Sequence, residues 1–198
     1  MKRWNKAALG LVFGVAMVAA VAQAQTQTQT QTQTQTASRD FAGGVVSEDG
    51  SLRVPENFRT DFVMLGAWSV AGDADTGGEI GLHIVYAPRR AVEAYRRTGA
   101  FPDGTVLVKE LFNGKTESLT TGEATSAAEI AGYFVMVKDT QGRFPGNPLW
   151  GDGWGWSFFK ADDPVRATTK DYMAECLACH EPARESDLVY IQAYPVLK

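Results

Sequence analysis

The chain has 198 residues, of which 19 are lysine or arginine and 23 are aspartate or glutamate, so its formal net charge is −4. This length is enough for one globular domain with one hydrophobic core and short flanking segments. An acidic chain without a basic patch is a poor nucleic-acid binder, so we expect no nucleic acid among its partners.

The N-terminus has the order of a secretory signal peptide. Three cations precede an apolar run over residues 7–22, which ends in the small-x-small sequence Ala22-Gln23-Ala24, and such a sequence is typical of a cleavage site. The apolar run is shorter than the roughly 20 residues that span a bilayer. We therefore predict a signal peptide over residues 1–24, cleavage near Ala24, a periplasmic location and no membrane attachment after cleavage.

A low-complexity segment follows the predicted signal peptide. Residues 25–36 are Gln-Thr dipeptides, which offer no apolar side chain to bury, so we predict a disordered linker over residues 25–39. The remaining residues, 40–198, are expected to form a single domain.

Residues 40–198 have mainly the pattern of β-structure. Strands are predicted where runs are rich in valine, isoleucine and aromatic residues, separated by glycine, proline and Asn-Gly signals. These runs are residues 61–70, 80–87, 105–113, 131–139 and 154–160. Helical patterns cover residues 88–98, with Gly99 after the end, and residues 169–179. We predict an α+β fold in which an antiparallel β-sheet predominates and a few helices accompany it.

Two residues in the predicted strands are candidates for a functional site. His83 could donate a hydrogen bond, relay a proton near neutral pH, bind a metal or have no role. Lys109 lies between Leu107 and Leu111 on one face of its strand. Such a lysine either extends its amine to solvent or holds it in an apolar site, where burial favours the neutral form. The sequence pattern leaves these alternatives open.

Asp171 begins the second helical pattern, directly after Thr168-Thr169-Lys170. An acidic residue at this place interacts favourably with the helix dipole. A carboxylate near a reactive centre can also accept protons. Glu175 has the same two interpretations.

The most informative motif is Cys176-Leu177-Ala178-Cys179-His180, which contains both cysteines of the chain. This spacing is typical of c-type haem attachment, in which each thiol forms a thioether with a vinyl group and the histidine binds iron. A dithiol redox pair and half of a zinc site are the alternatives, but zinc needs about four ligands and His83 is the one other histidine. We predict one covalent haem c per chain, attached through Cys176 and Cys179, with His180 as the metal ligand.

The position of this motif excludes two familiar classes of cytochrome c. Small electron-transfer cytochromes carry the motif near the N-terminus and use a methionine downstream of it, whereas no methionine follows His180. Cytochromes c′ carry the motif near the C-terminus but are all-helical, which conflicts with the predicted strands.

The sequence resembles the cytochrome P460 family, whose sheet-rich relatives include the cytochromes c′-beta. The resemblance covers nearly all of residues 40–198. Besides the haem motif, it rests on Tyr86-Ala87-Pro88, on the segment from Thr98 to Leu111, on Asp187-Leu188-Val189-Tyr190 and on Tyr194-Pro195-Val196-Leu197.

The resemblance bears on three residues outside the haem motif. In the family a lysine bonds through its side-chain nitrogen to the haem rim, and this role falls on Lys109. A carboxylate near the distal side of the haem accepts protons, and this role falls on Asp171. An arginine is typical near the position of His83, so histidine is a departure here, and proton acceptance by His83 is an expectation for this chain rather than a role that the family pattern supplies.

The activity that the resemblance implies is oxidation of hydroxylamine to nitrous oxide at the open side of the iron, with nitric oxide as a further ligand. Asp171 and His83 are then the candidate catalytic residues, a soluble redox partner takes the electrons, and the chain is expected to form a homodimer. One alternative is a non-catalytic nitric oxide binding protein similar to the cytochromes c′-beta. The other is an electron-transfer cytochrome whose sixth iron ligand is Met64, Met136 or Met173.

Overall fold

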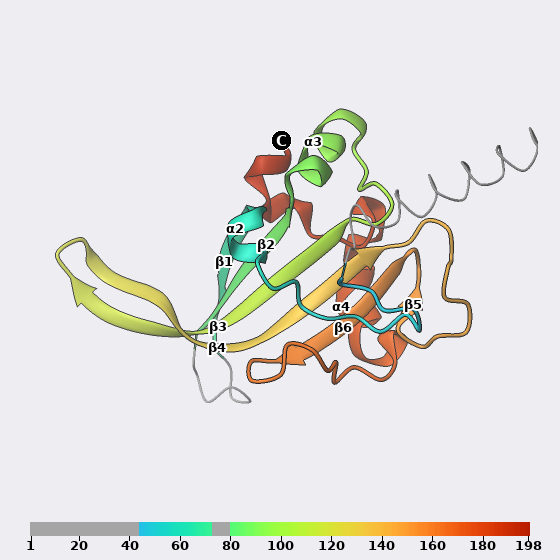
Figure 1. Cartoon of the computed structure of the whole chain (residues 1–198). Coiled ribbons are helices and arrows are strands. Elements are labelled where there is room, and N and C mark those ends of the chain that lie inside the picture. The colour runs from blue at the N-terminus through green and yellow to red at the C-terminus, as the bar shows by residue number, and fades with distance from the viewer. Residues whose placement is uncertain (1–43, 73–79) are drawn as a thin grey trace, which may run out of the picture. The chain divides into compact units, whose positions relative to one another are not determined.

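A six-stranded antiparallel sheet forms the centre of the fold (Figure 1). The computed structural model describes residues 44–72 and 80–198, so the predicted signal peptide and linker lie outside the described residues. The strand order is β1-β2-β3-β4-β6-β5. The strands are Phe62–Val70 (β1), Gly81–Pro88 (β2), Val106–Leu119 (β3), Gly122–Lys138 (β4), Trp150–Gly151 (β5) and Trp154–Lys160 (β6). The predicted α+β class with a predominant antiparallel sheet is confirmed.

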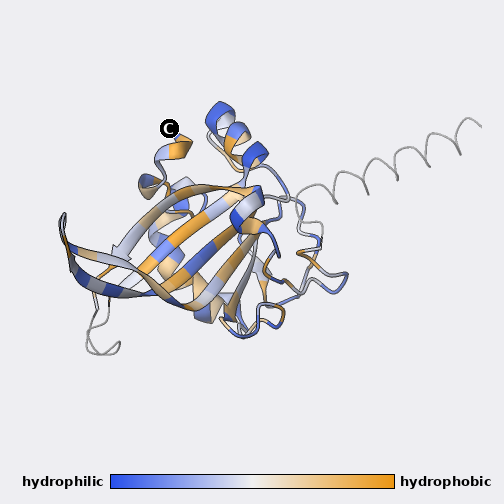
Figure 2. Ribbon diagram, turned by 60° about the vertical axis from the view of Figure 1, so that its left-hand side comes forward, coloured by the Kyte–Doolittle hydropathy of each residue, from blue (hydrophilic) through white to orange (hydrophobic). Residues whose placement is uncertain are grey.

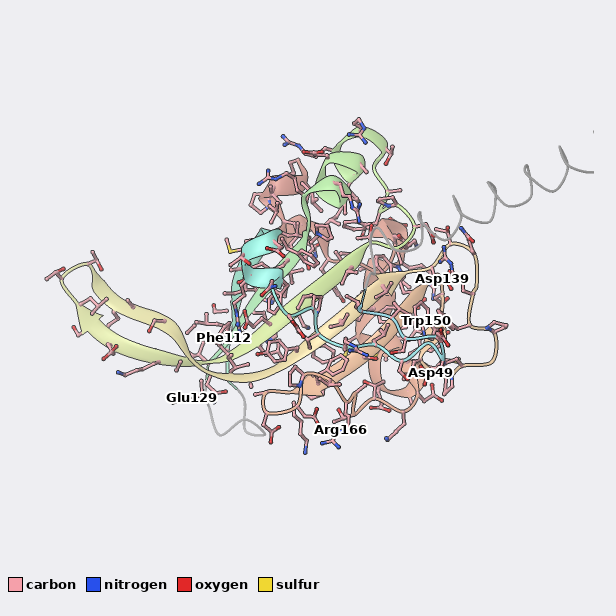
Figure 3. The ribbon with its side chains drawn as sticks, viewed as in Figure 1. Asp49, Phe112, Glu129, Asp139, Trp150 and Arg166 are labelled. Atoms are coloured by element: carbon pink, nitrogen blue, oxygen red, sulfur yellow. The ribbon has the colours of Figure 1, made fainter. Side chains whose placement is uncertain are left out.

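The β3–β4 hairpin is the largest departure from the predicted strands. We expected strands over residues 105–113 and 131–139 with a turn signal at Asn113-Gly114, but both strands continue to a turn at Thr120-Thr121. The hairpin projects beyond the rest of the sheet (yellow in Figure 1), and Phe112 and Glu129 lie near its base (Figure 3).

Gly114 fits inside β3 because another backbone segment approaches it closely. Its N–H donates to the Ile80 carbonyl at 2.6 Å, and a Cβ at this position would lie 2.7 Å from the same oxygen. The glycine therefore accommodates a close backbone contact, at a register shift of the ladder, rather than a turn.

The two faces of the sheet carry separate hydrophobic cores. Alternation along β3 sends Val106 and Val108 to one face, which we call the outer face, and Leu107 to the other, the inner face. Apolar and polar residues alternate along the central strands, while the projecting hairpin is mostly polar (Figure 2). The outer face packs against the N-terminal segment, which contributes Val45, Leu52, Val54 and Phe58.

Two α-helices flank the sheet, α2 (Phe58–Asp61) and α3 (Arg89–Thr98). Helix α3 buries Ala91, Val92 and Tyr95 and ends where Gly99 takes a φ of 73° and donates its N–H to the Tyr95 carbonyl at 2.7 Å. Glycine tolerates this left-handed cap without a steric penalty. The predicted helix over residues 88–98 and its glycine stop are confirmed.

The C-terminal segment, residues 172–198, packs on the inner face as a series of short helical turns. They are the π-helical η1 (Met173–Leu177), α4 (Ala178–His180) and the 3₁₀ turns η2 (Glu181–Ser186), η3 (Ile191–Ala193) and η4 (Pro195–Leu197). The helix predicted over residues 169–179 thus begins later and contains a π turn, a feature often found at functional sites. In the ranges 44–72 and 80–198, no helix is long and apolar enough to cross a membrane.

Candidate functional site

A cavity of about 200 Å³ lies between the inner face of the sheet and the C-terminal segment. The sheet contributes mostly apolar walls and one amine, while the C-terminal segment contributes the cysteine motif. Its lining includes Trp68, Leu107, Lys109, Phe134, Met136, Trp156, Glu175, Cys176, Cys179, His180 and Tyr194. The structure therefore brings Lys109 into the same cavity as the cysteine motif, although the two are far apart in the sequence.

Cys176 and Cys179 are both free thiols on the wall of this cavity. Burial raises the pKa of the Cys176 thiol to about 11, so that thiol stays protonated at neutral pH. A dithiol redox pair needs a thiolate with a lowered pKa, and this environment works against that alternative. Among the residues that the structure describes, no three His, Cys, Asp or Glu side chains gather as a metal-binding group, so the zinc alternative lacks its further ligands.

His180 is held by a backbone hydrogen bond. Its Nδ1 lies 2.7 Å from the Leu188 carbonyl oxygen, and because a carbonyl can only accept, Nδ1 carries the proton and Nε2 keeps its lone pair. Burial lowers the pKa of the imidazole, which favours this neutral form. The Trp156 ring packs edge-on against the imidazole, with 4.9 Å between ring centroids. His180 is therefore prepared to bind a metal through Nε2.

Lys109 lies on β3 beside Leu107, in the apolar part of the cavity. Its Nζ lies 4.5 Å from the centroid of the Phe134 ring. Burial lowers the pKa of the amine, which moves it toward the neutral, nucleophilic form. Of the two alternatives that the sequence left open, the structure shows the apolar site.

His83 lies on the same face of the sheet as Lys109 but outside the cavity lining. It pairs with Leu111, while Val85, two residues further along β2, pairs with Lys109. The His83 ring packs against Trp68, which does line the cavity, with 5.5 Å between ring centroids. Burial, and secondarily the charge of Lys109, lowers the pKa of His83 to about 4. The imidazole is thus neutral at neutral pH. A proton relay through His83 would have to protonate this ring, and the low pKa makes the protonated form short-lived.

Asp171 caps the start of the C-terminal helical segment. Its Oδ1 accepts a hydrogen bond from the Met173 N–H at 2.8 Å, which satisfies one of the free donors at a helix start. The Glu175 side chain reaches back to the residues before the helix. Its Oε1 accepts hydrogen bonds from the backbone N–H groups of Lys170 at 2.7 Å and Asp171 at 3.0 Å. The cavity lining includes Glu175 and does not include Asp171.

Three features of the cavity escaped the sequence analysis. Trp68 and Phe134 come from β1 and β4, and their place on one wall depends on strand register. The Leu188 carbonyl is a backbone group that carries no residue signature. The Tyr190 hydroxyl, which donates to the Cys179 carbonyl at 2.6 Å, comes from a segment that carries the family resemblance but no separate chemical motif.

The donors in this cavity fit haem. The porphyrin supplies four nitrogens of its own, so a single neutral imidazole suffices as protein ligand, and two thiols lie on the same helical segment as that imidazole. The aromatic and aliphatic walls suit the flat apolar ring.

The model of the family described as "Cytochrome P460" matches residues 55–191, which include His83, Lys109, Asp171 and the cysteine motif. No curated protein sequence matches the chain. The match covers more than half of the chain and agrees with the sheet-rich fold and the haem-compatible cavity, so this protein belongs to the cytochrome P460 family of haem cytochromes.

Proposed function

We propose that the protein is an exported c-type cytochrome, with one haem per chain, that oxidises hydroxylamine to nitrous oxide. The observation that carries the proposal is the meeting of Lys109 with Cys176, Cys179 and His180 in one largely apolar cavity. A haem motif alone is common to many cytochromes. A half-buried amine on the facing strand is the feature that the family resemblance ties to hydroxylamine chemistry.

Four residues would hold the haem. The Cys176 and Cys179 thiols would add across its two vinyl groups, and His180 would bind iron through Nε2. The Lys109 amine would replace a hydrogen on the porphyrin rim, a step that releases two protons and passes two electrons to an external oxidant. The haem, when bound, supplies the redox chemistry. The protein contributes the fixed imidazole tautomer, an amine whose pKa is lowered by burial, and apolar walls that exclude water.

Oxidation of hydroxylamine releases protons as well as electrons. Two hydroxylamine molecules give one nitrous oxide, one water, four protons and four electrons, so the site needs proton acceptors. Asp171 and His83 remain our proposed acceptors, and Glu175 joins them because it lines the cavity and is exposed to solvent. A soluble redox protein would take the electrons.

Nitric oxide binding without turnover is the second candidate function. The aromatic rings of Trp68, Phe134 and Trp156 on the cavity wall favour a small apolar gas. For an electron-transfer cytochrome, Met136 is the methionine that lines the cavity, whereas Met64 and Met173 are 53% and 62% exposed.

A steady-state assay with hydroxylamine and an artificial electron acceptor tests the proposal. Wild-type holoprotein is expected to consume hydroxylamine, and Lys109→Leu is expected to lower turnover at least tenfold because the haem loses its bond to β3. Peptide mass spectrometry should find the Lys109 peptide linked to haem. Lys115→Leu is the matched control, since Lys115 lies on the same strand but is exposed in the hairpin.

The outcomes separate the candidate functions. A wild-type protein that binds nitric oxide but does not consume hydroxylamine supports the gas-binding function and refutes the enzyme. A six-coordinate low-spin ferric spectrum without nitric oxide binding supports the electron-transfer cytochrome. Equal losses in Lys109→Leu and Lys115→Leu would show that the effect of Lys109 is not specific.

Export and dimerisation belong to the same proposal. The N-terminal sequence of protein isolated from the periplasm should begin near Gln25. Sedimentation of the holoprotein should give twice the chain mass. A cytoplasmic location would contradict the c-type assignment, because the thioether bonds of haem c form outside the cytoplasmic membrane, where the predicted signal peptide would direct the chain.

A further inference from the structure

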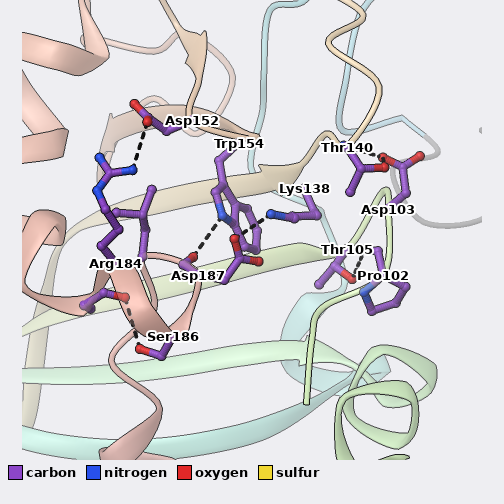
Figure 4. A network of polar contacts seen from close by, with 12 residues as sticks. Pro102, Asp103, Thr105, Lys138, Thr140, Asp152, Trp154, Arg184, Ser186 and Asp187 are labelled. Carbon is purple, nitrogen blue, oxygen red and sulfur yellow. Dashed lines mark hydrogen bonds and ion pairs between the residues drawn. The ribbon is translucent and has the colours of Figure 1, made fainter. Parts of the chain in front are cut away.

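A polar network connects Asp187 of the C-terminal segment with Lys138 and Trp154 of the sheet (Figure 4). Asp187 joins two strands of the sheet: Lys138 Nζ donates to its Oδ1 at 2.6 Å, and Trp154 Nε1 donates to its backbone oxygen at 3.0 Å. Lys138 is 8% exposed, and its Nζ also lies 4.8 Å from the Trp154 ring centroid. The ammonium is therefore held between a carboxylate and an indole face, unlike a surface ion pair.

The backbone that this network holds is unusual. Asp187 and Leu188 have φ values of 61° and 63°, in the left-handed region that residues other than glycine rarely adopt. Two successive residues of this kind persist where the surrounding structure holds them. The Leu188 N–H donates to the Ala183 carbonyl at 2.9 Å, and Leu188 is 2% exposed.

This strained pair directs one carbonyl group at the candidate iron ligand. The Leu188 oxygen accepts from His180 Nδ1 at 2.7 Å, and the direction of that carbonyl depends on the backbone angles of Asp187 and Leu188. A hydrogen bond from the far nitrogen of a metal-bound histidine fixes its ring orientation and raises its basicity as a ligand.

We propose that Lys138, Asp187 and Trp154 are positioning residues for His180. They hold the left-handed Asp187-Leu188 pair so that the Leu188 carbonyl accepts the Nδ1 proton, and they thereby strengthen Nε2 as an iron ligand. The inference rests on the proposed role of His180 as haem ligand and does not depend on hydroxylamine turnover.

Resonance Raman spectroscopy of the ferrous holoprotein tests this proposal, with the iron–histidine stretching frequency as the readout. Lys138→Met removes the cation and Asp187→Ala removes the carboxylate. Both are expected to weaken the hydrogen bond from His180 Nδ1 to the Leu188 carbonyl and so to lower the iron–histidine stretching frequency. Asp187→Asn is the informative conservative variant. Its amide oxygen can still accept from Lys138, and asparagine tolerates the left-handed region, so it should retain most of the wild-type frequency.

The midpoint potential separates positioning from simple electrostatics. Asp187→Ala and Asp187→Asn make the same change in charge, so a charge effect alone predicts equal rises of the potential. Positioning predicts a larger rise in Asp187→Ala, because a weaker histidine ligand stabilises ferric iron less. Arg143→Met is the matched control, since it breaks the neighbouring ion pairs with Asp103 and Asp139 and should leave the frequency unchanged.

Trp154→Phe keeps the idea testable if the first variants do not fold, because it keeps a ring in the core and removes the N–H that holds the Asp187 carbonyl. It should lower the frequency in the same direction. An unchanged frequency in the folded variants, or identical behaviour of Asp187→Ala and Asp187→Asn, would overturn the proposal. No substrate is needed, so a failure of turnover is distinguishable from a failure here. A wild-type protein without an iron–histidine band would refute the His180 assignment and this inference with it.

Discussion

The chemical role of a half-buried histidine can be inferred from the hydrogen-bond partner of its other ring nitrogen. His180 donates Nδ1–H to a carbonyl, which leaves Nε2 as a ligand atom. His83 packs instead against Trp68, and its pKa of about 4 results mainly from burial and secondarily from the charge of Lys109. The two histidines of the chain thus have different environments, although both are neutral at neutral pH.

His83 should make the stability of the holoprotein depend on pH. Its ordinary pKa of 6.5 falls to about 4 in the folded state, so between these values the unfolded chain binds a proton that the folded chain does not. Stability is then full above pH 6.5 and declines as the pH falls toward 4. Urea unfolding at several pH values should show this decline in the wild type.

His83→Gln is the comparison that isolates this residue, because carboxylates also titrate at the acidic end of the range. The variant should show a smaller loss of stability between pH 6.5 and 4 than the wild type. Parallel stability curves for the two proteins would mean that His83 is solvated in the folded state.

At the scale of elements, strand register places the walls of the cavity. Lys109 pairs with Phe134 across the β3–β4 ladder and with Val85 across β2–β3, so the inner face gathers residues from three strands around one amine. The bulge at Gly114 marks the point where the same two strands leave the body of the sheet and form the polar hairpin. The hairpin and the cavity therefore depend on one continuous ladder.

Gly114→Ala should weaken this ladder. A Cβ would lie 2.7 Å from the Ile80 oxygen and 2.9 Å from Thr125 Cγ2, so backbone must move, and we expect a loss of about 1–3 kcal/mol in the free energy of unfolding. Urea denaturation measures it. Ala127→Ser, at the exposed position that faces Gly114, should change stability by less than about 0.5 kcal/mol.

At the scale of the whole molecule, a buried charge joins the N-terminal segment to the sheet. Glu110 is fully buried on the outer face, Arg59 of α2 donates Nε to its Oε1 at 3.0 Å, and the other carboxylate oxygen has no partner among the described residues. The same strand thus presents Lys109 to the cavity and Glu110 to the opposite core. A carboxylate in this position depends on its one cation.

Arg59→Met should therefore destabilise the molecule by about 3 kcal/mol, at the low end of values for breaking a buried pair because the arginine side chain is half-exposed. Arg166→Met removes the arginine of an exposed pair with Asp163 and should cost less than about 1 kcal/mol. Because Arg59 lies on the outer face, the absorption spectrum of the haem should not change. Equal stabilities of Arg59→Met and Arg166→Met would contradict the dependence of Glu110 on Arg59.

The sequence by itself determined the fold class and displayed the haem-attachment motif. Cys176, Cys179 and His180 lie within five residues of one another, so their haem-attachment pattern is visible in the sequence alone. Period-two alternation predicted that Lys109 shares a face of its strand with Leu107 and Leu111, but it left open whether that face is buried. The glycine after α3 likewise indicated where that helix ends. These features are local, and local patterns are what a sequence displays directly.

The tertiary structure decided everything that depends on approach between distant segments. It brought Lys109 to the cysteine motif, turned Gly114 from an expected turn into a bulge, and showed Asp171 as a helix cap while Glu175 lines the cavity. It also placed the Leu188 carbonyl within hydrogen-bond distance of His180 Nδ1, next to Asp187, which Lys138 and Trp154 hold by hydrogen bonds. Such contacts arise from strand register and from left-handed backbone held by packing, which no pattern of neighbouring residues encodes.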